Sequence, residues 1–155
     1  VGRFDPQKDH KNLIEAVHIV IKSRPNLKVL LVGKDMNKDN KTLLDLVKSL
    51  NVEKNIIFLD QRTDIPAVMN TMDLHILSSS YGEGFPNVIA EAMACGTPCV
   101  TTDVGDSALI VGDLGWVTPV GDSEALANAI ITGLKEKDNK AKWLSRKQAV
   151  RQRIL

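Results

Sequence analysis

The sequence contains little cysteine, few aromatic side chains and no long apolar run. Two cysteines, Cys95 and Cys99, cannot frame a disulfide-rich secreted domain, so a reducing compartment is favoured. Three Phe, one Tyr and two Trp are too few for an RNA-binding platform on which bases stack. The longest apolar runs are far shorter than the roughly 20 residues of a transmembrane helix. These three classes of protein are therefore excluded.

Charge is nearly balanced in total but unevenly distributed along the chain. Lys and Arg number 20 and Asp and Glu 19, a net charge of +1 that gives no general attraction for nucleic acid, so no nucleic-acid partner is expected. No Lys or Arg occurs from Thr63 to Leu134, a stretch with nine acidic residues, whereas the first 62 residues hold twelve cations and those from Lys135 onward hold eight. A bound anion must therefore be held by backbone N–H groups of the middle stretch or by cations from the two ends.

The length and the two ends of the chain bound its organisation. A chain of 155 residues with 43% hydrophobic residues predicts one domain over 1–155. It opens with Val1 rather than Met and ends in a helical pattern, so we expect a fragment of a longer protein. The basic stretch from Lys135 onward is explained by a solvated helix face, with contact to an acidic membrane surface as the alternative. We expect a cytoplasmic protein, with the inner face of the membrane as the alternative location.

Short apolar runs alternate with helical patterns along the chain. The runs at 28–33, 56–59, 74–77 and 98–101 are typical of strands buried on both faces of a parallel sheet, and Val1 is expected to lie inside a further strand. Apolar spacing and capping residues predict helices over 12–23, 42–50 and 64–72, one that opens at Pro86 and closes at Gly96, and one that begins at Asp122. Repeated β-α units of this size predict an α/β domain with a doubly wound, Rossmann-like parallel sheet.

In such a sheet, ligands bind where the carboxyl ends of the strands lead into helices. Arg3 and Lys8 lie on the loop that leaves the expected first strand and are spaced to straddle a diphosphate, although ordinary surface charge explains them equally well. Glycines on both sides of Glu83 allow the backbone of a later loop to approach a ligand closely. This edge of the sheet is therefore the candidate site.

The helix expected from Pro86 adds two further features to this edge. Its first N–H groups, those of Asn87 and Val88, point at an anion under the helix dipole. Glu91, one turn further on, suits a pair of sugar hydroxyls because a carboxylate accepts two hydrogen bonds at once. Its other explanation is that an acidic residue in the first turn favours the helix dipole without any ligand.

The segment from Glu83 to Pro98 resembles the Glu-x7-Glu signature of retaining glycosyltransferases with the GT-B fold, of the glycosyltransferase 4 type. Val1-Gly2-Arg3 with Lys8 is similar to the Gly-Arg…Lys phosphate clamp of that family, and the segments 64–79 and 121–127 resemble its connecting segments in the same order. The resemblance covers nearly the whole chain. It implies the C-terminal half of a GT-B fold, which binds the donor, with the N-terminal acceptor-binding domain absent from this chain.

The resemblance also implies a site for a nucleotide-diphosphate sugar. Arg3 and Lys8 would hold the diphosphate and Glu83 would contact hydroxyls of the donor sugar, so these three are the expected catalytic residues. The expected substrate-binding residues are Gly2, Gly33, Leu59, Asp60, Gly84, Phe85, Pro86, Asn87, Val88 and Glu91. The full-length enzyme would transfer the sugar with retention of configuration to a sugar or lipid-linked acceptor, in polysaccharide or glycoconjugate synthesis. This fragment alone is expected to be inactive.

Parts of that set have separate expected roles. Gly33 and the turn at Leu59 and Asp60 would border the nucleobase, Asn87 and Val88 would meet the distal phosphate, and Glu91 would hold the ribose. Two segments depart from the family pattern. Many members carry Gly-Gly-x-x-Glu where this chain has Gly105-Asp106-Ser107-Ala108-Leu109, and the loop Gly33-Lys34-Asp35-Met36 lacks a second glycine.

No metal or cofactor is expected beside the donor substrate. The chain has no Asp-x-Asp, and His10, His18 and His75 are scattered without metal-ligand spacing.

Two other classes of function stay open. A dinucleotide-binding Rossmann domain of an oxidoreductase would carry Gly-x-Gly-x-x-Gly after its first strand, where this chain reads Gly-Arg-Phe-Asp-Pro-Gln. A non-catalytic α/β interaction module would bind neither ligand.

Overall fold

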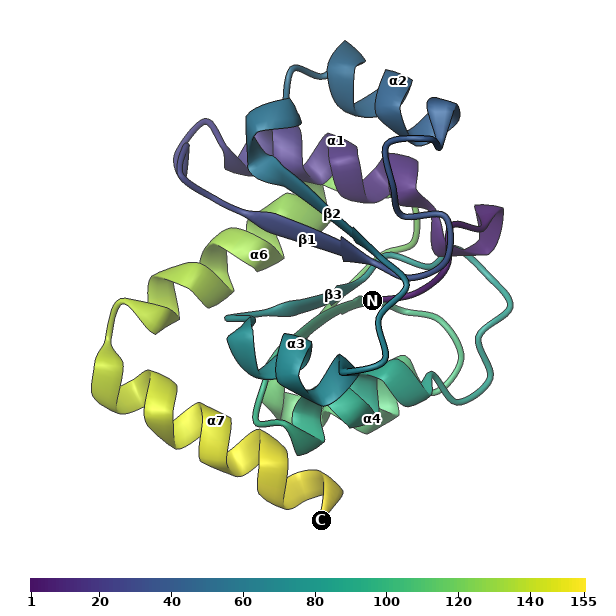
Figure 1. Cartoon of the computed structure of the whole chain (residues 1–155). Coiled ribbons are helices and arrows are strands. Elements are labelled where there is room, and N and C mark those ends of the chain that lie inside the picture. Colours follow the sequence, from purple (N-terminus) through teal and green to yellow (C-terminus); the bar gives the residue numbers. More distant parts are fainter.

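A computed structural model describes all 155 residues and shows strands alternating with helices (Figure 1). The strands are β1 (Val29–Val32), β2 (Ile56–Asp60), β3 (His75–Leu77), β4 (Cys99–Thr102) and β5 (Trp116–Thr118). The α-helices are α1 (His10–Val20), α2 (Lys41–Ser49), α3 (Ile65–Thr71), α4 (Asn87–Ala94), α5 (Ser107–Val111), α6 (Ser123–Lys137) and α7 (Lys140–Ile154). Short 3₁₀ turns are η1 (Pro6–Lys8), η2 (Glu53–Asn55) and η3 (Gly112–Leu114).

All strand pairs are parallel, in two groups ordered β2-β1 and β3-β4-β5. The four strands predicted from apolar runs are confirmed, with bounds that differ by at most one residue. Two short elements, β5 and α5, are not predicted from the sequence, because three and five residues are too few to show a period. The parallel pairing confirms the α/β class.

Helices cover both faces of the strands, as a doubly wound sheet requires (Figure 1). Cys99 packs in a core with α3, α4, α5 and α7, whereas its neighbour Val100 packs in a core with α1 and α6. Successive residues of a strand point to opposite faces, so this pair marks the two layers. A third core joins α1 and α2 to β1 and β2.

The predicted helix boundaries are mostly confirmed by their capping geometry. Asp122 precedes α6 and accepts the N–H of Ala125 at 2.9 Å, and Gly96 has a φ of +74° just beyond α4. Asp64 precedes α3 as predicted but does not cap it. Its two carboxylate oxygens instead accept hydrogen bonds from Nε and Nη2 of Arg62, at 2.8 and 2.7 Å.

The strand expected at Val1 does not form. Gly2 and Phe4 donate hydrogen bonds to the carbonyls of Val32 and Lys34, at 2.8 and 2.9 Å, so this segment runs beside the end of β1. On the side of β3, the Val1 amino group lies 3.3 Å from Nε2 of His75. So short a segment, bonded in this way at one edge, lacks the repeated pairing of a strand.

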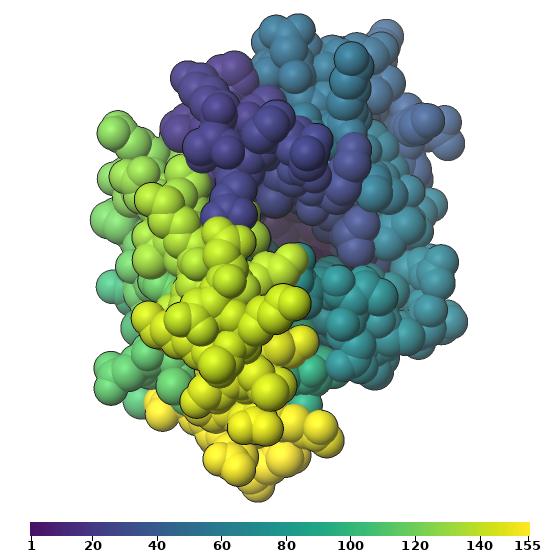
Figure 2. All heavy atoms as spheres, turned by 90° about the vertical axis from the view of Figure 1, so that its left-hand side faces the viewer, coloured from purple at the N-terminus to yellow at the C-terminus, as the bar shows by residue number.

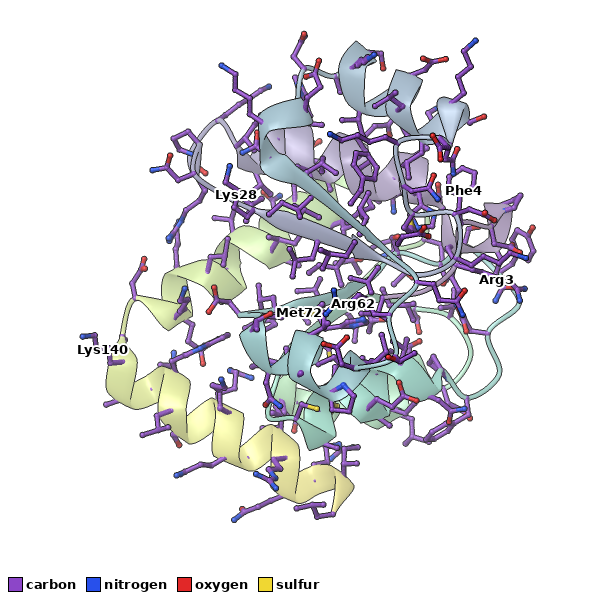
Figure 3. All side chains as sticks on the ribbon, viewed as in Figure 1. Arg3, Phe4, Lys28, Arg62, Met72 and Lys140 are labelled. Carbon is purple, nitrogen blue, oxygen red and sulfur yellow. The ribbon has the colours of Figure 1, made fainter.

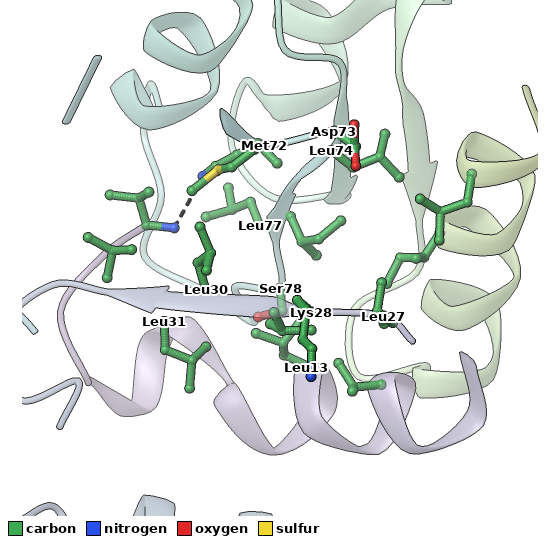
Figure 4. Close-up of a pocket in the computed structure, with 18 of the residues that line it drawn as sticks. Leu13, Leu27, Lys28, Leu30, Leu31, Met72, Asp73, Leu74, Leu77 and Ser78 are labelled. Carbon is green, nitrogen blue, oxygen red and sulfur yellow. Dashed lines mark hydrogen bonds between the residues drawn. The ribbon is translucent and has the colours of Figure 1, made fainter. Parts of the chain in front are cut away.

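A cavity of about 760 Å³ lies between β1 and β3, where the two groups of strands part (Figure 4). Its lining is largely apolar and includes Leu13, Leu30 and Leu77. Figure 2 shows the surface hollowed between the segment that precedes β1 and the end of α3, beside α6. The cavity follows the strands and touches the loops at their carboxyl ends only through a few residues such as Gly2 and Lys8.

Candidate functional site

The first loop approaches the carboxyl ends of β1 and β2 through close backbone contacts. The N–H of Gly33 donates to the carbonyl of Asp60 at 2.9 Å. A Cβ atom on Gly33 would lie 2.1 Å from the carbonyl oxygen of Gly2, so only glycine fits here. Gly2, Gly33 and Asp60 are thus brought together as predicted, with Leu59 half-buried beside Asp60 at the end of β2.

Arg3 lies at the same end of the molecule with its side chain toward solvent. The side chain is 64% exposed, and its Nε donates to Oδ2 of Asp5 at 3.1 Å. The other carboxylate oxygen of Asp5 accepts the N–H of Gln7 at 2.9 Å and caps η1. This backbone hydrogen bond, with a smaller contribution from Arg3, holds the pKa of Asp5 below its usual value.

Lys8 and Glu83, which are 75 residues apart in sequence, form the central ion pair of the site. Nζ of Lys8 donates to Oε1 of Glu83 at 2.5 Å, and their side chains are only 20% and 9% exposed. Oγ of Ser79 donates to the same carboxylate oxygen at 2.7 Å. Burial raises the pKa of Glu83, but the hydrogen bonds from Lys8 and Ser79 outweigh it, so the pKa lies below its usual value. Glu83 is therefore a carboxylate at neutral pH.

The N-terminus of α4 presents donors that the protein does not use. Pro86 precedes the helix without a side-chain cap, and the backbone N–H groups of Asn87 and Val88 donate no hydrogen bond within the chain. Unpaired N–H groups at a helix N-terminus attract anions. Glu91 lies one turn further along α4 and is exposed, as are Gly84 and Phe85 in the preceding loop. Of the predicted positions around α4, Asn87 is also exposed and Val88 is half-buried, whereas Pro86 is buried.

The loop after β4 packs against the loop that carries Glu83. The N–H of Asp106 donates to the carbonyl of Gly84 at 2.9 Å. A Cβ on Gly105 would lie 2.2 Å from the carbonyl oxygen of Glu83, and the φ of Gly105 is +49°. Gly105 is therefore required for this packing. The sequence pattern singles out the segment from Gly105 but does not reveal this contact.

Ser79 is the residue of the site that sequence reasoning misses. It is fully buried just beyond β3, and it donates to the same oxygen of Glu83 as Lys8 does. Strand alternation is the available signal, because His75, Leu77 and Ser79 project to the same side. A hydroxyl four residues before Glu83, at the end of a strand, is consistent with such a contact but does not specify it.

The first cation of the C-terminal helix α7 lies far from this site. Lys140, the first residue of α7, lies on the opposite side of the molecule from Arg3 (Figure 3). Near the other end of α7, Arg153 donates to the carbonyls of Ile110 and Leu109, both at 2.7 Å. Lys140 and Arg153 therefore do not contribute to the candidate anion site, which has Arg3 and Lys8 from the N-terminal end of the chain beside the backbone of the middle stretch.

The cysteines and histidines are not among the candidate site residues. Cys95 and Cys99 are both free thiols, and burial raises the pKa of Cys99 far above its usual value. Burial is the main cause that lowers the pKa of His10 to about 4, and the positive charge of Lys8 lowers it further. Burial also keeps the pKa of His75 well below its usual value. No three His, Cys, Asp or Glu residues are grouped in a way that could hold a metal ion.

These features define a parallel α/β domain with a candidate anion site built from loop cations, an anchored carboxylate and a helix N-terminus. The family described as Glycosyl transferases group 1 matches residues 1–150. The chain is 32% identical over 140 residues to the N-acetyl-alpha-D-glucosaminyl L-malate synthase of Bacillus anthracis, a match that covers 89% of this chain and 36% of that protein. The chain belongs to the glycosyl transferases group 1 family, and the family resemblance of its motifs is confirmed.

Solved structures agree with this assignment. HepE of Anabaena, in complex with UDP and glucose, is 34% identical with a TM-score of 0.83, and the match covers 99% of this chain and 43% of that one. WaaG, a glycosyltransferase of lipopolysaccharide biosynthesis, is 25% identical with a TM-score of 0.83, covering 99% and 41%. The fold is the C-terminal half of GT-B, and the matches do not support an oxidoreductase. The chain spans about a third of the length of the curated relatives it matches.

Proposed function

We propose that this chain is the donor-binding part of a retaining glycosyltransferase, which transfers a sugar from a nucleotide-diphosphate sugar to an acceptor. One observation carries the proposal. Lys8 and the carboxylate of Glu83 meet in a largely covered position, a few residues before the free N–H groups of α4. A cation and unpaired N–H groups bind a diphosphate, while a carboxylate accepts hydrogen bonds from sugar hydroxyls. Family membership and the UDP complexes of HepE support a nucleotide sugar as the ligand.

The reaction needs negative charge to be stabilised on the leaving diphosphate. Breaking the bond between sugar and phosphate leaves that charge behind, and donors that are already in place stabilise it without reorganisation. In the proposed complex Lys8 and Arg3 bind the phosphates from one side, and the N–H groups of Asn87 and Val88 bind them from the other. Lys8 turns part of its hydrogen bonding from Glu83 to phosphate, and Glu83 holds a hydroxyl of the donor sugar.

The remaining predicted residues surround the rest of the donor. Gly2 and Gly33 have no side chains, so their backbone can lie close to the nucleobase. Leu59 and Asp60 border the nucleobase. Gly84, Phe85 and Pro86 place backbone next to the sugar. Glu91 accepts hydrogen bonds from the ribose hydroxyls.

Calorimetric titration tests the proposal and separates it from the two other classes. We expect nucleoside diphosphates and their sugar conjugates to bind, with UDP and UDP-glucose first in the panel, and NADH not to bind. Binding of NADH in preference to every nucleoside diphosphate would establish the dinucleotide alternative. Binding of none of these ligands would favour a non-catalytic module.

We propose that the donor binds without a divalent metal, because cations and N–H groups of the protein stand ready for the phosphates. The expectation is an unchanged affinity for UDP in excess chelator. A loss of affinity that Mn²⁺ or Mg²⁺ restores would contradict it.

We propose a sugar or lipid-linked acceptor, bound by a further domain of a longer protein that works in the cytoplasm and associates peripherally with membrane. A relative from Escherichia coli, 29% identical, is named as a galactosyltransferase acting on a diphosphoundecaprenol-linked sugar, which supports this class of acceptor.

The exposed cations of α7 suit an anionic surface. None of the helices combines the length and apolar character needed to cross a bilayer. Sedimentation of the full-length protein with anionic but not neutral vesicles is the expected result, and equal sedimentation with both would contradict it.

A further inference from the structure

The backbone of Ser79 is held in place by a hydrogen bond from β4. It is fully buried just beyond β3, and its carbonyl accepts a hydrogen bond from Oγ1 of Thr102 at 2.6 Å. Thr102 is the last residue of β4 and is also fully buried. This hydrogen bond fixes the backbone of Ser79, so the position from which its side chain projects is set by the sheet rather than by the exposed loop that follows.

The Ser79 hydroxyl points into the site and binds one oxygen of Glu83. Oε1 of Glu83 accepts from Ser79 at 2.7 Å and from Lys8 at 2.5 Å. With both strong donors on Oε1, the second oxygen, Oε2, is the one available to a ligand. Gln7, whose side chain lies over Gly82, adds a smaller stabilisation of the carboxylate.

The two donors to Oε1 differ in what a ligand does to them. Lys8 is a flexible cation that a diphosphate attracts, so its bond to Glu83 weakens when the donor binds. Ser79 is uncharged and buried, so its bond to Glu83 persists. The orientation of the carboxylate in the loaded site therefore depends on Ser79.

We propose that Ser79, backed by Thr102, is a positioning residue that aims Oε2 of Glu83 at a hydroxyl of the donor sugar. This inference rests on the proposed function, because it gives Glu83 the sugar as its ligand. It predicts that Ser79 matters for the sugar part of the donor and not for the diphosphate.

Ser79→Ala is the direct variant, and Ser80→Ala is its matched control. Ser80 is the next residue, and its Oγ lies 3.5 Å from the carbonyl of Gln7 rather than against Glu83. Calorimetry with UDP and UDP-glucose measures the gain in affinity that the sugar confers. We expect Ser79→Ala to reduce that gain by about tenfold, with UDP affinity within about twofold of the unmodified chain, since a hydrogen bond to a charged group is lost. Ser80→Ala should leave both affinities unchanged.

An unchanged gain in Ser79→Ala would overturn the inference. Equal losses for UDP and UDP-glucose would also overturn it, because they would place the effect on the phosphates or on folding. If the unmodified chain binds neither ligand, the proposed function fails instead.

A ligand-free measurement keeps the role of Ser79 testable in that case. NMR titration of the Glu83 side-chain carboxyl should show a higher pKa in Ser79→Ala and the unmodified pKa in Ser80→Ala, since a hydrogen bond to the charged form lowers a pKa. A Glu83 pKa that is identical in both variants would mean that Ser79 does not orient this carboxylate.

Discussion

Lys8 and Arg3 carry the same charge, but the protein gives them different surroundings. The side chain of Lys8 is largely covered and bound to Glu83, whereas Arg3 is 64% exposed and bound to its neighbour Asp5. Water screens an exposed charge more than a covered one, so an anion gains more from Lys8. At the scale of single residues, the two members of the predicted clamp are therefore not equivalent.

The first prediction is that Lys8→Ala weakens UDP binding by about tenfold or more, since a charged hydrogen bond contributes roughly 1.5–3 kcal/mol. Arg3→Ala should weaken it less, and neither change should affect the affinity for uridine. Lys11→Ala is the control, because Lys11 is exposed on α1 and lies 3.9 Å from Glu15. Calorimetry provides the affinities, and equal losses for uridine and UDP would rule out a phosphate role for Lys8.

The second prediction separates the two glutamates of the signature. Glu83→Gln should leave UDP affinity unchanged or raise it, because Lys8 loses its charged partner, and should reduce the gain that the sugar confers. Glu91→Gln should weaken UDP and UDP-glucose alike, because Glu91 is assigned to the ribose. Glu124→Gln is the control, since Glu124 is an exposed acidic residue in the first turn of α6.

Thermal-shift measurements with each ligand distinguish these roles from a purely structural one. If both glutamates serve only the helix dipole, the variants lose stability without any ligand-dependent difference. A loss of UDP affinity in Glu83→Gln as large as in Glu91→Gln would refute the assignment.

At the scale of elements, sequence patterns predict what depends on local period and capping. Four strands and five helices follow from apolar spacing, because such patterns record which face is buried. The contacts that build the site are not local. Lys8 meets Glu83 across 75 residues of sequence, and Gly105 lies against the Glu83 loop because β3 and β4 pair in the folded sheet. Residue types at the carboxyl edge are thus predictable, whereas the supports behind them need the tertiary structure.

The third prediction tests the support that the loop after β4 gives to the site. Gly105→Ala places a methyl group against the backbone of Glu83 in a left-handed conformation, so we expect a loss of about 2–5 kcal/mol in the free energy of unfolding. Gly121→Ala is the control, with a φ of +69° but nothing within 4 Å of the added Cβ, and should cost only about 1–2 kcal/mol. Urea unfolding measures both, and equal losses would mean that the close approach at Gly105 does not constrain this loop.

At the scale of the whole molecule, two buried histidines couple stability to pH. His10 and His75 are buried, and one ring nitrogen of each, Nδ1, has no hydrogen-bond partner. Burial lowers the pKa of His10 to about 4 and that of His75 well below its usual value, so both rings stay neutral in the folded protein. The unfolded chain takes up these protons near pH 6.5.

The fourth prediction is that stability falls as the pH drops from about 6.5 toward 4, because the unfolded state binds more protons in this range. The loss of stability due to His10 grows until about pH 4, where it reaches roughly 3 kcal/mol in the free energy of unfolding. Urea midpoints measured between pH 7 and 4 should show a shallower decline in His10→Gln than in the unmodified chain. Identical slopes would contradict the low pKa of His10.

The molecule offers two different places for a ligand, and their separation makes the binding site directly measurable. The cavity between β1 and β3 is lined largely by apolar residues such as Leu30 and Ile76, whereas the proposed donor site lies at the carboxyl ends of the strands. NMR mapping of backbone amides during titration with UDP distinguishes them. We expect the largest shifts at Asn87 and Val88, with further shifts in the loops that carry Lys8 and Glu83. Shifts confined to Leu30, Ile76 and their neighbours would contradict a donor site at the N-terminus of α4.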